Sequence, residues 1–156
     1  MKRVLASALA AALAVGVFGS SAHLAPAHAQ NAGMGIEILQ PTGPVTVPAN
    51  GKITLTVAVH GFTFDPADMS KAPKPGKGHG HFYIDRVPVG GYTSAAIAAN
   101  PKNGWAGVFT STHVVFDLKK SALKVTRGQH LLILNLAQNN HQLYRAPAAA
   151  IAINVR

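Results

Sequence analysis

The residues of this sequence whose type and spacing could do chemistry are histidines, and two of them form a motif. His79 and His81 are separated by a single glycine. In an extended chain, residues two apart point to the same side and their Cα atoms lie roughly 7 Å apart, so two imidazoles can reach one metal ion. Imidazole nitrogen suits copper, zinc and nickel. We therefore take His79 and His81 as two ligands of a copper or zinc site.

The spacing leaves the third ligand of such a site open. His141, which follows two asparagines in a turn, is one candidate, and His60, His130 and Asp85 are the others. Among these we favour His141. The alternative interpretation is structural, because a histidine in a turn or at a strand edge often does no more than hydrogen-bond a neighbouring backbone group.

Extended strands must position these histidines, because segments of alternating apolar and polar residues recur between turn signals and helical periodicity is missing. We expect strands at residues 35–40, 53–60, 79–85, 108–109, 114–118, 130–137 and 148–155, with an additional edge strand near residues 45–47. About seven strands without room for crossover helices predict an all-β fold, an antiparallel immunoglobulin-like β-sandwich.

The strand at residues 79–85 has a core face and a histidine face. We expect Phe82 and Ile84 in the core, and the face with the two histidines directed away from it, at the surface of the domain. The strand at residues 130–137 is apolar on nearly both faces, so we expect it in the centre of a sheet. Residues 65–78 are rich in Pro, Gly and Lys and predict a loop. Residues 92–107 stay largely unassigned, with a short helix or a loop at 94–100.

The N-terminus has the pattern of a secretory signal peptide. Lys2 and Arg3 precede an uncharged apolar run at residues 4–18, and Ala27 and Ala29 provide the small residues of an A-x-A cleavage site. The apolar run is shorter than the roughly 20 residues that a membrane-spanning helix needs. We therefore predict a signal peptide at residues 1–29 and one domain at residues 30–156, periplasmic or secreted, without a transmembrane segment after processing. The chain has no Cys, so no disulfide contributes.

The charge of the chain is basic, with 14 Lys and Arg against 5 Asp and Glu, a formal net charge of +9. Basic charge raises the question of nucleic-acid binding. The basic residues are scattered, without a basic helix or an aromatic-interleaved RNA-binding signature, and export separates the protein from nucleic acid. We expect no nucleic-acid partner.

Signatures of common enzyme classes are missing from the sequence. It has no G-x-S-x-G, H-E-x-x-H, P-loop or dinucleotide-binding motif. A histidine-containing, β-rich exported chain shares features with copper/zinc superoxide dismutases. Those enzymes, however, have an H-G-x-H-x-H context, a bridging histidine and normally a disulfide, which this chain lacks. We therefore predict a protein that is not an enzyme.

A longer pattern surrounds the histidines. It comprises residues 78–85, Gly-His-Gly-His-Phe-Tyr-Ile-Asp, then residues 128–136, Gly-Gln-His-Leu-Leu-Ile-Leu-Asn-Leu, and then Asn140 and His141. This pattern resembles secreted bacterial immunoglobulin-like domains of unknown function. They share a G-x-G-H-x-H-x-Y-x-D strand and a later G-x-H-x-L-x-L-x-L-x-x-N-x-H strand and turn. The similarity runs from about residue 53 to 155 and implies a small exported immunoglobulin-like domain. The sequence departs from the pattern at residues 86–88, Arg-Val-Pro, where an acidic residue followed by glycine is usual.

The sequence thus predicts an exported binding domain that holds copper or zinc through His79, His81 and His141. A structural or adhesive immunoglobulin-like module without metal is the first alternative. A superoxide-dismutase-like metalloenzyme is the second. A protein partner is not indicated by any motif.

Overall fold

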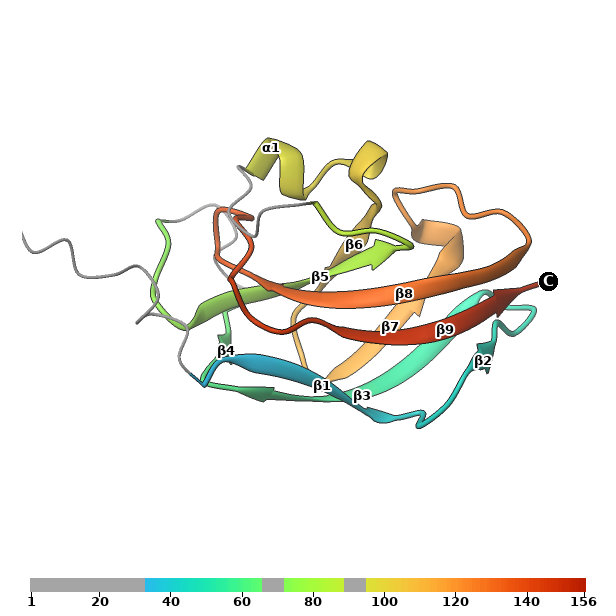
Figure 1. The fold of residues 1–156 in the computed structure, drawn as a ribbon, viewed down its shortest axis with the longest axis horizontal. Coiled ribbons are helices and arrows are strands. Elements are labelled where there is room, and N and C mark those ends of the chain that lie inside the picture. Colours follow the sequence, from blue (N-terminus) through green and yellow to red (C-terminus); the bar gives the residue numbers. More distant parts are fainter. Residues whose placement is uncertain (1–32, 66–71, 89–94) are drawn as a thin grey trace, which may run out of the picture.

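The computed structural model describes residues 33–65, 72–88 and 95–156. The signal peptide predicted for residues 1–29 lies outside these ranges. The described residues form nine strands and three short helical segments (Figure 1). They are β1 (Gly35–Gln40), β2 (Val45–Thr46), β3 (Lys52–His60), β4 (Thr63–Phe64), β5 (Lys77–Ile84), α1 (Ala95–Ala98), η3 (Pro101–Asn103), β6 (Trp105–Phe109), β7 (His113–Asp117), η4 (Leu118–Lys120), β8 (Gly128–Ala137) and β9 (Ala149–Val155).

The strands form two sheets that pack as a sandwich. One sheet has the order β1-β3-β7, and the other has the order β2-β9-β8-β5, with β4 and β6 both paired to β5. If β1 and β2 are taken as a split first strand, β3, β5, β7, β8 and β9 occupy the places of the second, third, fifth, sixth and seventh strands of an immunoglobulin domain. The prediction of an all-β, immunoglobulin-like sandwich is therefore confirmed.

The pairing is antiparallel except at two sheet edges. β2 pairs with β9 and β4 with β5 in parallel. The chain leaves the first sheet after β1, where prolines cannot donate to a ladder, and it continues in the same direction along the second sheet. β2 consequently runs parallel to β9. Each parallel pair is short, because β2 and β4 have two residues each, and the long ladders are antiparallel as expected.

The main core lies between the two sheets. Phe82 and Ile84 of β5 lie in it, as predicted, and Phe82 packs against Phe109 and Phe116 with ring centroids 4.9 and 5.0 Å apart. β8 is central, paired with β5 on one side and β9 on the other. Its residues Leu132, Leu134 and Leu136 are fully buried in this core, which confirms the prediction for that strand.

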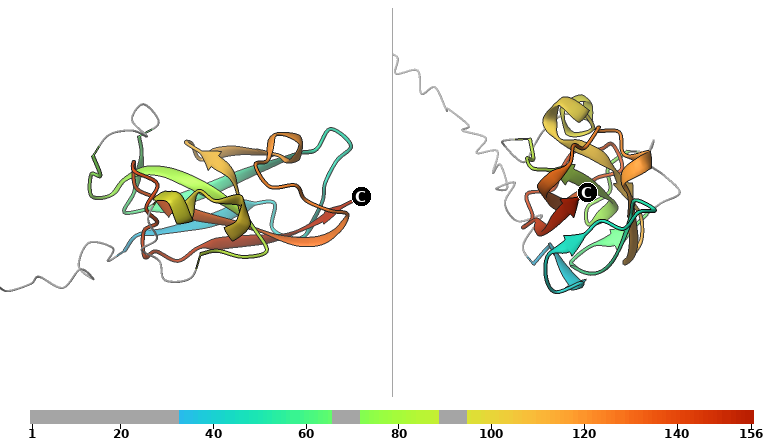
Figure 2. Two further views of the ribbon diagram at one scale, coloured as in Figure 1. Left: turned by 90° about the horizontal axis from the view of Figure 1, so that it is seen from above. Right: turned by 90° about the vertical axis from the view of Figure 1, so that its right-hand side faces the viewer.

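A second apolar cluster covers the outer face of β5 and β8, and here the sequence-based expectation was wrong. The cluster consists of Tyr83, Ala98, Ile133, Ala137 and Leu143, with Val87 and Trp105 packed against it. Figures 1 and 2 show that the segment with α1 lies over this sheet, on the side opposite β1 and β3. The histidine face of β5 is therefore buried and not a solvent face.

No helix among the described residues is long and apolar enough to cross a membrane.

Candidate metal centre

Three histidines meet at the edge of the outer cluster. His79 and His81 are neighbours on the same face of β5, and His141 lies in the turn after β8. Antiparallel pairing places His79 directly opposite Ala137, the last residue of β8, so the following turn folds over the beginning of β5. The structure therefore brings together the three residues that the sequence proposed as ligands.

The turn that carries His141 is a short hairpin loop. The N–H of Gln138 donates to the carbonyl of Gln142 at 2.7 Å, and the N–H of His141 donates to the carbonyl of Gln138 at 2.9 Å. The side chain of Asn140 accepts a hydrogen bond from the N–H of Gln142 at 3.1 Å. His141 itself has φ 65°, in the left-handed region. Three-residue hairpin loops commonly place glycine at this last position, because other residues are strained there.

The imidazole nitrogens of the three histidines form a nearly equilateral triangle. Nε2 of His79 lies 3.0 Å from Nε2 of His81 and 3.0 Å from Nδ1 of His141, and the last two atoms are 3.1 Å apart. Within the described part of the chain, this is the group of side chains whose ligand atoms are close enough to share a metal ion.

The proton position on His81 is fixed by its neighbours. The hydroxyl of Tyr83 lies 2.7 Å from the carbonyl oxygen of Ala98, which can only accept, so Tyr83 must donate its single proton there. The same hydroxyl lies 3.1 Å from Nδ1 of His81 and must accept from it. Nδ1 of His81 therefore carries the proton, and Nε2 presents a lone pair to the triangle. Such hydrogen bonds to the outer nitrogen fix the tautomer of metal-binding histidines.

The three nitrogens cannot satisfy one another by hydrogen bonding. Each contact between two imidazole nitrogens needs one donor and one acceptor. Donors and acceptors cannot alternate around a ring of three, so at least one contact joins two lone pairs or two N–H groups. A cation that accepts all three lone pairs resolves this conflict, because the nitrogens then bind the same ion.

The histidines are held in the neutral form that metal binding requires. Burial and, to a smaller extent, the charge of a protonated His141 lower the pKa of His79 from 6.5 to about 4. Burial and the neighbouring His79 and His141 lower the pKa of His81 to about 2. Burial also lowers the pKa of His141. At neutral pH each imidazole therefore offers a lone pair without first losing a proton.

Glycine between the two histidines is required by the opposite face of β5. Gly80 points into the main core, where a Cβ atom would collide with the ring of Phe109. His79 and His81 thus lie on one face of a strand, and the residue between them faces the core and must be small.

Residues that cover the site were not predicted. Tyr83 lies two residues after His81 and therefore on the same face of β5 as the two histidines. Its hydrogen bond to Ala98 could not be predicted, because it depends on how the segment after residue 94 folds. The indole of Trp105 lies against His81, with ring centroids 6.3 Å apart. Among the described residues, the buried side-chain atoms without a hydrogen-bond partner belong to Trp105, to His79 and to Asn139, which lies in the His141 turn.

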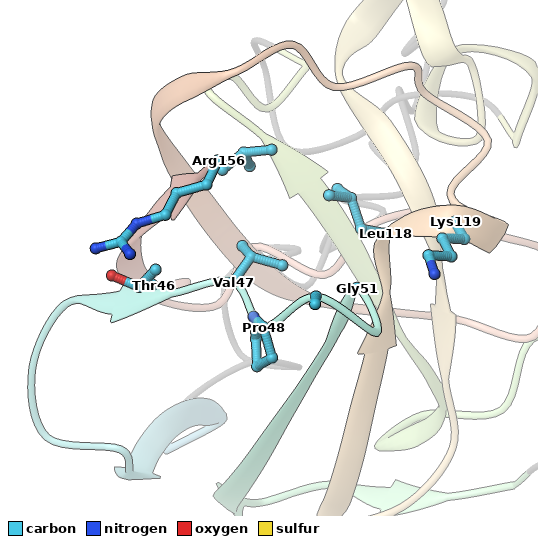
Figure 3. A pocket seen from close by; sticks show the side chains of 9 residues that line it. Thr46, Val47, Pro48, Gly51, Leu118, Lys119 and Arg156 are labelled. Atoms are coloured by element: carbon cyan, nitrogen blue, oxygen red, sulfur yellow. The ribbon is translucent and has the colours of Figure 1, made fainter.

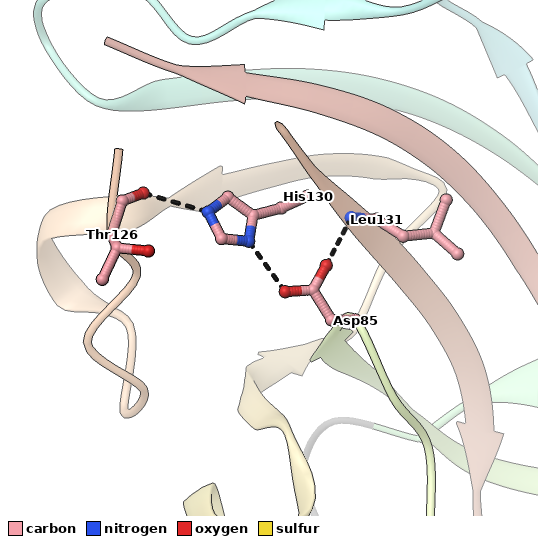
Figure 4. Close-up of polar contacts among 4 residues, drawn as sticks. All are labelled: Asp85, Thr126, His130 and Leu131. Atoms are coloured by element: carbon pink, nitrogen blue, oxygen red, sulfur yellow. Dashed lines mark hydrogen bonds and ion pairs between the residues drawn. The ribbon is translucent and has the colours of Figure 1, made fainter. Parts of the chain in front are cut away.

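The other candidate ligands do not join the triangle. Asp85 follows the far end of β5, and its carboxylate contacts Nδ1 of His130 at 2.7 Å and accepts from the N–H of Leu131 at 2.8 Å (Figure 4). Nε2 of His130 faces the carbonyl of Thr126 at 3.0 Å, so both of its nitrogens have oxygen partners. Partial burial raises the pKa of Asp85, but the hydrogen bonds from His130 and Leu131 outweigh this and lower it. His60 lies exposed at the end of β3.

One pocket of the structure is separate from the histidines. It has a volume of about 540 Å³ and lies between the β2–β3 turn, the start of η4 and the end of β9, lined among others by Val47, Leu118 and Arg156 (Figure 3). The end of β9 pairs with the beginning of β8, whereas the triangle lies beyond the end of β8. No histidine or carboxylate side chain is among the residues that line this pocket.

No protein-family model matches this sequence, and no curated protein matches it. Among solved structures, the chain is similar to the fibronectin(III)-like modules of Clostridium thermocellum CbhA. The sequence identity is 9%, the alignment covers 78% of this chain and 95% of that chain, and the TM-score is 0.41.

Proposed function

We propose that this protein is an exported, non-enzymatic binding domain that holds one copper or zinc ion through His79, His81 and His141. The observation that carries the proposal is the triangle of imidazole nitrogens, with sides of 3.0 to 3.1 Å. His141 is separated from the other two by 60 or more residues, so the fold, and not the local sequence, brings it there.

Three features favour a metal ligand role over a structural one. The nitrogens cannot all be paired by hydrogen bonds with one another. His81 has its Nε2 free of protons because Tyr83 fixes the tautomer. His141 occupies a left-handed backbone position at which three-residue hairpin loops commonly have glycine, and this position directs its imidazole to the other two. A structural module without metal is the alternative, and in it the three imidazoles would only pack against each other.

The test is metal binding by the protein produced without an affinity tag, since a tag adds histidines. Isothermal titration calorimetry with Cu²⁺ and Zn²⁺ should detect one site per chain. The double variant His79→Ala/His81→Ala should lose it. The variants His60→Ala and His113→Ala are matched controls, because each removes an exposed histidine outside the triangle and should leave affinity unchanged. Absence of binding to the wild type, or equal losses in the controls, would favour the structural alternative.

Export is part of the proposal and is supported by the N-terminal sequence pattern. If residues 1–29 are a signal peptide, mass spectrometry of the exported protein should place the N-terminus at, or within one or two residues of, Gln30. A mature chain that still contains residues 4–18 would contradict export by cleavage and would favour a membrane-anchored protein.

A further inference from the structure

The small size of the nitrogen triangle determines where an ion can lie. Metal–nitrogen distances to histidine are about 2.0–2.1 Å, and with these distances an ion would lie about 1 Å out of the plane of the three nitrogens, with N–metal–N angles of about 95°. An ion in the plane would need nitrogens farther apart than the observed 3.0 and 3.1 Å. The three histidines therefore form one face of the coordination sphere and leave its opposite side without a ligand from the triangle.

The charge of the three histidine ligands indicates which kind of ligand binds on the opposite side of the ion. Three neutral imidazoles leave the full charge of a divalent ion uncompensated, and the group contains no carboxylate or thiolate among the described residues. His79 and His81 are 0% exposed, so solvent screening at the ion is weak. Burying an unpaired charge is costly, and an anionic ligand removes that cost.

Of the three histidines, His141 is the one that is partly exposed to solvent. His141 is only partly buried, and its turn neighbours Asn140 and Gln142 are also partly exposed. His79 and His81 are covered by the outer cluster. The part of the site nearest to solvent is therefore the turn, and we place the approach of a small ligand on this side.

We propose that a divalent ion bound here keeps one exchangeable coordination position and that a small monovalent anion occupies it. This inference rests on the proposed metal site. The anion class consists of small monovalent anions that bind a metal ion through one atom, such as hydroxide and azide. The exchange is a ligand substitution, in which the anion displaces a metal-bound water molecule and no electron is transferred.

The experiment is a titration of the Cu²⁺-loaded, full-length protein with sodium azide. Azide bound to Cu²⁺ gives a charge-transfer absorption band and changes the electron paramagnetic resonance spectrum. We expect a saturable change with one azide per copper. Sodium perchlorate at the same ionic strength, which coordinates poorly, should give no change. The His60→Ala variant loaded with copper should behave as the wild type, and the copper-free protein should show no band.

The outcomes separate the two proposals. Copper binding without any spectral response to azide would overturn the exchangeable position and leave the proposed function intact. A response that perchlorate reproduces, or a loss of copper from the protein during the titration, would also overturn it. Failure of the wild type to take up copper would overturn both. A saturable response with retained copper content supports the inference.

Discussion

The backbone at His141 allows its role as a ligand to be separated from its role in the fold. His141 has φ 65° at the last position of the hairpin loop that follows β8. We consider two variants, His141→Gly and His141→Ala. Both remove the imidazole and with it one side of the nitrogen triangle. They differ in backbone freedom, because glycine adopts positive φ readily and alanine does not.

The difference between the variants can be estimated from backbone energies. Positive φ costs a residue with a Cβ atom roughly 1–2 kcal/mol, and the greater freedom of glycine in the unfolded chain offsets about 0.4–1 kcal/mol of this. Without metal, His141→Gly should therefore be more stable than His141→Ala by about 1 kcal/mol. For a domain of this size that corresponds to a Tm difference of about 4 °C.

Metal should affect the wild type and the variants differently. A free metal concentration of about 100 times Kd stabilises the binding-competent protein by about 2.7 kcal/mol. The wild type should gain this stability, and both variants should gain far less because they retain only His79 and His81. Urea unfolding followed by tryptophan fluorescence, with Zn²⁺ and with a chelator, measures both differences, since Trp105 lies in the cover of the site.

Two results would refute this reasoning. If the alanine variant without metal is as stable as the glycine variant, the left-handed backbone at residue 141 does not exist in solution. If zinc stabilises the two variants as much as the wild type, His141 is not a ligand. The two results are independent, because one is measured without metal and the other depends on it.

Three further predictions concern the neighbours of the triangle. Without metal, stability should fall as pH decreases from about 6.5 towards 4, because the lowered pKa values of His79 and His81 mean that only the unfolded chain takes up protons there; urea unfolding at pH 7 and 5 measures this, and a flat profile would contradict it. Tyr83→Phe should weaken metal binding by about 10–100-fold without unfolding the domain, because Nδ1 of His81 loses its acceptor; calorimetry measures this, and unchanged affinity would show that Tyr83 does not orient the ligand. Gly80→Ala should destabilise the domain by about 1–3 kcal/mol through collision with Phe109, and Phe109→Leu in the same chain should recover part of the loss. Thermal unfolding measures both effects, and an unchanged Tm in Gly80→Ala would show that residue 80 does not pack against Phe109.

The features that the sequence predicted correctly are those with a short period. Alternation of apolar and polar residues placed the first strand at residues 35–40 and the last at 148–155, and the structure has them at Gly35–Gln40 and Ala149–Val155. The same period of two put both histidines of the motif on one face of β5. His141 was chosen from several histidines, and the structure places it beside the other two because β8 pairs with β5.

The burial of the histidine face was missed because its cover has no such period. The cover comes from Ala98 at the end of α1, from Trp105 at the start of β6, and from Leu143 after the hairpin loop. Each of these lies in a segment without alternation or helical repeat. Whether a strand face is exposed depends on what packs over it, and non-periodic segments give no signal for this in a single sequence.

The burial of the triangle and the conflict among its nitrogens have one physical consequence. A buried polar group without a compatible partner costs stability, and His79 and His81 are 0% exposed. The remaining core of the sandwich must offset this cost in the metal-free protein. Binding of an ion removes the cost, so metal affinity and folding stability are linked. Weakening the outer cluster, for example at Leu143, should therefore lower metal affinity even though that side chain cannot be a ligand.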